Sequence, residues 1–202
     1  MKNMFQNQNK ISYIDVSNFD TSKVTNMTYM FFNNHNLENL DVSNFDTSNV
    51  ENMKSMFYNC YNLSTIDVSG FDTSNVTDMS WMFCDLSSIS YLDVSNFNIS
   101  KVTNMKGMFE DCHNLESLDV TSFDTSKVAN MRRMFYNWSS ATTIYASNKF
   151  ITDNVTNSNQ MFTNNSLLIG GNGTTYSASH VNKEYARIDT EETPGYFTLK
   201  EI

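Results

Sequence analysis

The chain has 202 residues, of which 40% are hydrophobic, and a formal net charge of −9. This hydrophobic content is sufficient for a core and argues against intrinsic disorder. The acidic balance, without a sizeable Lys/Arg cluster, argues against nucleic acid and anionic membranes as partners. No signal peptide is visible and no apolar run reaches transmembrane length, so we expect no direct membrane insertion of this segment.

The chain begins halfway through a repeating unit. Its Met1, Met4 and Phe5 recur one unit later as Met27, Met30 and Phe31. Because the ends of a solenoid normally carry a polar cap, we expect either a fragment of a longer protein or an unusually short first coil.

Five near-identical 26-residue units make up most of the chain. Each unit contains a sequence of the type DVSNFDTSKVTNM, and the Asp residues that open it are Asp15, Asp41, Asp67, Asp93 and Asp119. A fixed period of this length is typical of a solenoid, in which each unit buries its apolar face only against its neighbours.

The first half of each unit predicts a strand and a turn. In residues 40–43, Leu40 and Val42 alternate with Asp41 and Ser43, which indicates a short strand with one face inward. Stacked units would then form one parallel sheet. Just past the strand we expect a tight bend with positive φ at Asn18, Asn44, Gly70, Asn96 and Ser122. Asx-turns are expected next, at Asp20, Asp46, Asp72, Asn98 and Asp124.

The second half of each unit predicts a helix of about two turns. The residues that can cap it are Asn26, Asn52, Asp78, Asn104 and Asn130. Two Met and one Phe follow each cap at positions i, i+3 and i+4, which places them on one face of a helix. A Met stripe can bind metal or form a promiscuous groove, but the Phe beside each pair favours core packing.

The repeat degrades after residue 144. Tyr145 stands where Asp is expected, and after Phe162 the period is lost. We therefore divide the chain into a repeat region, residues 1–144, with a partial first coil and five 26-residue units, and a degenerate last repeat with a C-terminal cap, residues 145–202. Within the cap we expect β-structure around residues 185–188 and 196–198.

These patterns resemble two known groups. The pattern LxxLxVxxF followed by a short helix is similar to a leucine-rich repeat variant, which implies an α/β solenoid with one short parallel strand and one short helix per 26-residue coil, closed by a C-terminal cap. More specifically, DVSNFDTSNVTNMxxMFxxCxxL resembles the surface-protein repeat of the BspA-like group of Gram-positive bacteria and mycoplasma lipoproteins. The tail from Gly170 to Thr198 resembles the segment that follows those repeats. The resemblance implies a cell-surface or secreted location and a role in adhesion or host contact.

No catalytic or cofactor motif is visible in the sequence. The histidines, His35, His113 and His180, are scattered and belong to no Cys or Ser motif. Cys60 and Cys112 are two units apart, on the order of 10 Å, which is beyond disulfide reach. Cys84 lies two positions off that column, so a bridge from it is possible but not implied. We expect three buried or half-buried thiols.

The Asp column, defined as Asp15, Asp41, Asp67, Asp93 and Asp119, has two readings. Stacked carboxylates could hold a cation such as Ca²⁺, which favours carboxylate oxygens. One Asp per coil does not supply the six or more ligands that Ca²⁺ prefers, and a Ser or Thr two residues on can donate hydrogen bonds instead. We therefore expect a scaffold role and no bound metal.

Specificity is expected where the units differ while facing outward. The residues two before each Asp meet both conditions, and we call them the variable column: Tyr13, Asn39, Thr65, Tyr91, Ser117 and Thr143. Aromatic and small polar residues on a regular surface suit contact with a protein or a glycan. The alternative is an ordinary solvated surface.

The sequence favours a non-enzymatic binding module of an extracellular bacterial surface protein, whose solenoid face contacts a host or bacterial surface protein or a glycan. The alternative is a structural stalk that presents another domain from the cell wall. An enzyme with its site in residues 145–202 is disfavoured, because no catalytic constellation is visible there.

Overall fold

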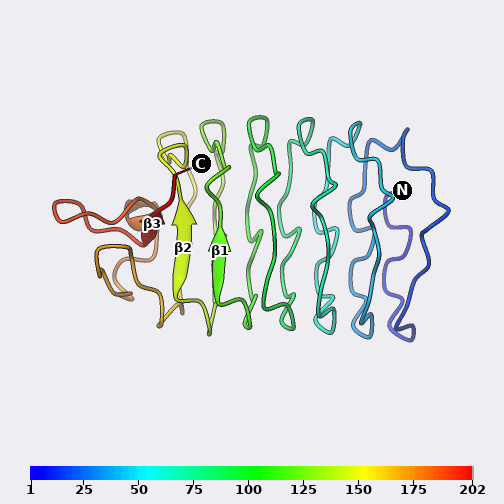
Figure 1. The fold of residues 1–202 in the computed structure, drawn as a ribbon, viewed down its shortest axis with the longest axis horizontal. Helices are drawn as coiled ribbons and strands as arrows, with labels where there is room; N and C mark the ends of the chain where they lie inside the picture. The colour runs from blue at the N-terminus through cyan, green and yellow to red at the C-terminus, as the bar shows by residue number, and fades with distance from the viewer. Residues whose placement is uncertain (202) are drawn as a thin grey trace.

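The computed structural model describes residues 1–201 as successive coils stacked side by side along the long axis of the molecule (Figure 1). Neighbouring coils meet at parallel bridges that join equivalent positions of successive units, such as Asn26 with Asn52 and Asn104 with Asn130. The last of these bridges joins Asn130 to Asn157, because the final unit is one position longer than the others. This arrangement is consistent with the expected repeat solenoid, whereas the division at residue 144 stays a prediction.

Within residues 1–201, regular strands occur only at the C-terminal end of the stack. Strands β1 (Ser117–Asp119), β2 (Thr143–Ala146) and β3 (Phe197–Leu199) form a parallel sheet in the order β1-β2-β3 (Figure 1). The register pairs Leu118 with Ile144 and Tyr145 with Thr198. The expected β-structure at residues 196–198 is thus confirmed, whereas residues 185–188 contribute one bridge, from Ile188 to Phe197.

The expectation of a strand in every coil is therefore correct only for the burial pattern. Leu40 and Val42 are buried while Asp41 and Ser43 are exposed, as a strand with one inward face requires. The Asp carboxylate accepts the N–H two residues on both in coils without a regular strand, as at Asp15 and Asp41, and at Asp119, the last residue of β1. Strand β2, which has Tyr145 at this position, pairs on both sides, with β1 and with β3.

The predicted helix in each coil is absent. Among residues 1–201 the only helical element is the 3-10 turn η1 (Lys183–Tyr185). In place of a helix, alternate N–H groups bond to the next coil, as from Met27 N–H to the Asn52 carbonyl at 2.9 Å and from Phe31 N–H to the Met56 carbonyl at 2.9 Å. Bonds across three residues, such as Met30 N–H to the Met27 carbonyl at 3.1 Å, fold the chain into turns between these links.

Left-handed backbone at two positions in each unit explains why no helix forms. One such column, with φ between 52° and 62°, contains Tyr29, Ser55, Trp81, Gly107, Arg133 and Gln160. The other contains Asn33, Asn59, Asp85, Asp111, Asn137 and Asn164. A left-handed residue interrupts the right-handed ladder of an α-helix, and Asn and Asp adopt this conformation more readily than most residues. The second column is thus a sequence signal for turns.

Two details of the predicted turns need correction or refinement. The expected positive φ after the strand is wrong, because neither Asn18, Asn44, Asn96, Ser122 nor Gly70 has it. Asn44 instead donates from Nδ2 to the Val16 carbonyl of the previous coil at 3.0 Å. The expected caps do accept hydrogen bonds, as from Thr28 N–H to Asn26 Oδ1 at 2.9 Å, but each starts a turn and not a helix. The Asx-turns are confirmed, as at Asp46, which accepts Ser48 N–H at 3.0 Å.

The core consists of columns of identical side chains. The Met residues of the repeat after the first partial coil, such as Met27 and Met30, are fully buried, which confirms core packing. One Phe from each coil stacks on the next with ring centroids 5.5 to 6.1 Å apart; the stack contains Phe5, Phe31, Phe57, Phe83, Phe109, Phe135 and Phe162. Successive coils thus contribute the same ring to one continuous column.

The cysteines are buried and free, as expected. The Cys60 thiol donates to the Phe31 carbonyl at 3.0 Å, and the Cys112 thiol donates to the Phe83 carbonyl at 3.2 Å. Burial raises the pKa of both thiols to about 12. Asn34 occupies the same repeat position and donates from Nδ2 to the Phe5 carbonyl at 2.9 Å. This column therefore supplies internal donors to the backbone of the preceding coil.

The C-terminal segment covers the last coil. Phe162 N–H donates to the Val181 carbonyl at 2.9 Å, and the buried Tyr196 ring lies edge-on to the Phe162 ring at 5.1 Å. The Asp189 carboxylate accepts from the Thr174 hydroxyl at 2.6 Å and from the Gly195 N–H at 3.1 Å. This carboxylate fastens two turns of the segment together.

Candidate functional site

The Asp column is a set of turn-forming carboxylates. Each Oδ1 accepts the N–H two residues on; the pairs are Asp15 with Ser17, Asp41 with Ser43, Asp67 with Ser69, Asp93 with Ser95, and Asp119 with Thr121. Side-chain and backbone hydrogen bonds from the Ser residues lower the pKa of Asp15, Asp41 and Asp67. Across residues 1–201 no three His, Cys, Asp or Glu side chains gather as a metal site would require.

The variable column faces solvent along one side of the stack. Tyr13 and Tyr91 are the most exposed large side chains of the column, at 62% and 73%. Asn39, Thr65 and Ser117 are exposed and Thr143 is half-buried. Bridges from Tyr13 to Asn39 and from Ser117 to Thr143 align neighbouring members. The structure thus places these side chains on one face, and their role as a ligand-binding face stays a prediction.

A hollow of about 330 Å³ opens beside Tyr91 on this face. We call it the Tyr91 hollow; its polar and aromatic lining residues are Tyr91, Asp93, Ser95, Ser117, Asp119, Tyr145 and Lys200. It brings together two members of the variable column and two members of the Asp column. Of the other variable-column residues, Tyr13, Asn39, Thr65 and Thr143 do not line it.

Lys200 closes one side of the Tyr91 hollow from the C-terminal segment. Its Nζ lies 2.6 Å from Asp119 Oδ2 and 5.5 Å from the centroid of the Tyr145 ring. Its backbone N–H donates to the Ala146 carbonyl at 3.0 Å, which anchors the residue beside β2. The hydrogen bond to Asp119 raises the pKa of Lys200. Partial burial opposes ionisation of Asp119, but bonds from Lys200 and Thr121 hold its pKa below the usual value.

Two residues of the Tyr91 hollow, Tyr145 and Lys200, were not predicted as site residues from the sequence. Tyr145 carried a usable signal, because it is the exception in an otherwise uniform Asp column. Lys200 carried none, because it reaches Asp119 across 81 residues through the pairing of β3 with β2. The site therefore depends on the C-terminal segment as well as on the repeats.

The chemistry of the Tyr91 hollow suits recognition. Two aromatic rings provide flat apolar surface, and the carboxylates, the ammonium group and the Ser hydroxyls provide charge and hydrogen bonds. None of the three histidines lines it; His35 stacks on Tyr61 at 5.0 Å, His180 stacks on Tyr185 at 4.3 Å, and His113 lies 4.0 Å from Asp111.

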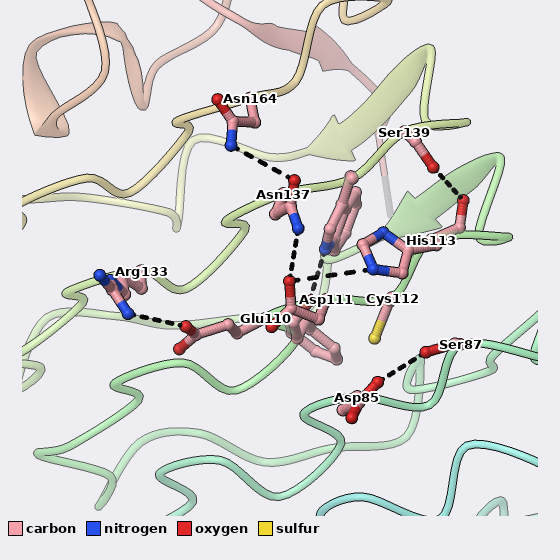
Figure 2. Close-up of polar contacts among 12 residues, drawn as sticks. Asp85, Ser87, Glu110, Asp111, Cys112, His113, Arg133, Asn137, Ser139 and Asn164 are labelled. Atoms are coloured by element: carbon pink, nitrogen blue, oxygen red, sulfur yellow. Dashed lines mark hydrogen bonds and ion pairs between the residues drawn. The ribbon is translucent and has the colours of Figure 1, made fainter.

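A second polar cluster joins the coils along the turns, around the second left-handed column (Figure 2). Asn137 donates from Nδ2 to Asp111 Oδ1 at 2.7 Å, and Arg133 forms an ion pair with Glu110 at 3.1 Å. Asp85 lies in the same column and bonds to the Ser87 hydroxyl at 2.6 Å, while burial, with help from the Asp111 charge, raises its pKa. These contacts satisfy polar groups between coils.

Comparison with known proteins places the chain in a family. No curated protein and no solved structure matches it. In residues 1–201 no helix is long and apolar enough to cross a membrane. The family model described as "Mycoplasma protein of unknown function, DUF285" matches residues 1–91 and 62–170. These two overlapping matches span most of the chain, and the chain therefore belongs to the DUF285 family.

Proposed function

We propose that the chain is a non-enzymatic binding module of a BspA-like bacterial surface protein, located outside the cell and active in adhesion or host contact. Membership in the DUF285 family and the stacked coils support this proposal, together with the resemblance of the 26-residue unit. The coils would form a leucine-rich-repeat-type solenoid in which paired turns replace the helix.

The Tyr91 hollow is the observation that carries the proposal. Tyr91 is 73% exposed and lines the hollow, so its ring is open to a ligand. Around it, Tyr145 and the Lys200–Asp119 pair supply an apolar surface and fixed charges. A glycan or a protein loop can place an apolar face against the rings and polar groups against Asp93 and Lys200.

Binding to immobilised host matrix proteins and a panel of neutral glycans tests the proposal. For the probe that the chain binds best, Tyr91→Ser should weaken binding at least tenfold, about 1.4 kcal/mol, because exposed aromatic anchors dominate interfaces. Tyr61→Ser is the matched control, because Tyr61 is a surface Tyr at 37% exposure that does not line the hollow. Tyr13→Ser asks whether the ligand extends along the variable column to the other end of the stack.

Two results would overturn the proposal. Equal binding by the Tyr91→Ser variant and the parent chain would reject the hollow as the site. A reproducible turnover assay on any substrate would reject a non-enzymatic role.

A structural stalk is the second candidate, favoured by the continuity of the stack. The Phe column and the inter-coil bonds run from Phe5 to Phe162. A chain joined in this way would keep a fixed length between two other domains. This role would be favoured if the chain alone bound no probe while a longer protein that contains it bound a probe through another domain.

A further inference from the structure

We call the side of the stack that carries the left-handed turns the turn side. It carries three cations that are far apart in the sequence. Lys54, Lys106 and Arg132 occupy one repeat position in three different units, so they form no cluster along the chain. Among residues 1–201 the ion pairs are His113–Asp111, Arg133–Glu110 and Lys200–Asp119, and none involves these three side chains. The coils therefore bring together unpaired positive charge on a protein of net charge −9.

Trp81 lies between two of these cations. Its ring centroid is 4.2 Å from Lys106 Nζ and 5.4 Å from Lys54 Nζ. A Cβ at Gly107 would lie 2.5 Å from Trp81 Cδ1, so the indole rests against the backbone of the next coil. Cation–π attraction keeps both ammonium groups beside the half-buried indole. We call Lys54, Trp81, Lys106 and Arg132 the basic stripe.

None of the three cations of the basic stripe forms an ion pair within residues 1–201. Burial lowers the pKa of Lys106, and the nearby Arg132, Arg133 and Lys54 add to this effect while Glu110 opposes it. In the described part of the chain, Arg132 Nε has no hydrogen-bond acceptor. Arg133 differs, because it forms an ion pair with Glu110 (Figure 2) and donates from Nε to Gln160 Oε1 at 2.9 Å. An anion from outside would relieve the mutual repulsion of the three cations.

A second column of Lys residues differs from the basic stripe in its exposure and in its nearby carboxylates. Lys23, Lys101 and Lys127 also share one repeat position, and all three are exposed. Lys101 donates to Asn75 Oδ1 at 2.8 Å and helps to lower the pKa of Asp72, and Lys127 helps to lower the pKa of Asp124. Asp72 and Asp124 thus compensate part of the charge of Lys101 and Lys127.

We propose that the basic stripe binds a linear acidic glycan that carries sulfate or carboxylate groups. The three cations lie about 10 Å and about 5 Å apart along the stack at the usual strand spacing, so they suit anions distributed along a chain. The anions of such a chain can meet Lys54, Lys106 and Arg132, while Trp81 holds the two Lys side chains in place.

Charge density favours a glycan over a nucleic acid. Duplex DNA carries about one charge per 1.7 Å, a much closer spacing than the about 5 and about 10 Å between the three cations, which suit a chain with fewer charges per unit length. The basic stripe lies on the turn side, away from the variable column, so this proposal does not depend on the Tyr91 hollow.

Titration with a heparin oligosaccharide, a neutral dextran and a DNA duplex at low and moderate salt tests the proposal. We expect binding to heparin that weakens with salt, no binding to dextran, and weaker binding to DNA. The triple variant Lys54→Gln, Lys106→Gln, Arg132→Gln should lose at least thirtyfold in affinity. The matched triple variant Lys23→Gln, Lys101→Gln, Lys127→Gln removes the same charge and should change it less than threefold.

The outcomes separate clearly. Absence of heparin binding, an equal loss in both triple variants, or tighter binding to DNA would overturn the proposal. Lys106→Gln alone, expected to lose about fivefold, keeps the test valid if a triple variant fails to fold. Tyr61→Ser, at a surface residue outside the Tyr91 hollow, should leave heparin affinity unchanged. Because heparin is not among the probes that test the Tyr91 hollow, failure of one proposal is distinguishable from failure of the other.

Discussion

The two long sides of the stack differ in their hydrogen bonding. One is the turn side, and the other, which we call the strand side, carries the variable column and the Asp column. On the turn side, backbone hydrogen bonds link coil to coil from Asn3 to Asn137, and Asn or Asp recurs at fixed positions. On the strand side of residues 1–201, regular pairing is limited to β1, β2 and β3, apart from the isolated bridges of Tyr13 with Asn39 and of Ile188 with Phe197. Regularity on the turn side therefore leaves the variable column free to differ from coil to coil.

The largest expected effect comes from the Phe column on the turn side. Phe83 is fully buried and stacks on Phe57 at 5.9 Å and on Phe109 at 5.8 Å. Phe83→Ala should reduce the free energy of unfolding by about 3–5 kcal/mol, because it removes a large ring and leaves a cavity. Tyr91→Ala on the strand side should change it by less than about 0.5 kcal/mol. Urea unfolding measures both, and similar losses would contradict the comparison.

A buried amide should matter next. Asn34 accepts the Gln8 N–H at 2.8 Å and donates to the Phe31 carbonyl at 2.7 Å. Asn34→Ala leaves buried backbone groups without partners and should cost about 2–3 kcal/mol. Asn36→Ala, which removes an exposed bond to the Asn9 carbonyl, is the control and should cost well under about 1 kcal/mol. Equal urea midpoints for the two variants would show that the column of internal donors is dispensable.

Glycine substitutions distinguish the observed turns from the predicted helix. Ser55 has φ 52° and Gly107 has φ 58°. Ser55→Gly should leave stability unchanged or raise it by up to about 1 kcal/mol, because left-handed backbone penalises residues with a Cβ. Gly107→Ala should lower stability by at least about 1 kcal/mol, because the new Cβ meets Trp81. A helix predicts the opposite sign for both changes, which urea unfolding would reveal.

Sequence periodicity predicts some features of this fold and not others. Burial of Met27, Met30 and Phe31 follows from apolar spacing alone, because both a helix and paired turns can direct these positions inward. The helix prediction failed because spacing i, i+3, i+4 does not report the sign of φ, whereas Asn33 and its Asn or Asp equivalents do favour left-handed turns.

Prediction of the candidate site was limited by long-range contacts. Tyr91 could be singled out because its column varies while the scaffold around it does not. Lys200 joins Asp119 only after β3 has paired with β2, and the basic stripe forms only when successive coils stack. Such sites follow from the three-dimensional arrangement, and a linear search for charge clusters does not find them.

The smallest expected effect is a change in the acid stability of the strand side. The pKa values of Asp15, Asp41 and Asp67 are lowered from 3.8 in the folded chain by hydrogen bonds from Ser17, Ser43 and Ser69. A carboxylate with a lowered folded pKa stabilises the protein above its unfolded pKa. That contribution is lost as pH falls below about 4 and through the folded value.

Replacing these three Asp residues by Asn removes the titration but keeps an Oδ1 acceptor for each turn. The triple variant should therefore lose less stability than the parent chain between about pH 4 and pH 2, as measured by urea unfolding at each pH. Asp85 and Glu110, whose pKa values burial raises, contribute with the opposite sign in both proteins and cancel in the comparison. The triple variant Glu38→Gln, Glu51→Gln, Glu116→Gln removes equal charge from exposed positions and should follow the parent curve. If the Asn variant also follows that curve, these three carboxylates act in their turns only as neutral acceptors would, and the acid sensitivity of the protein does not come from Asp15, Asp41 and Asp67.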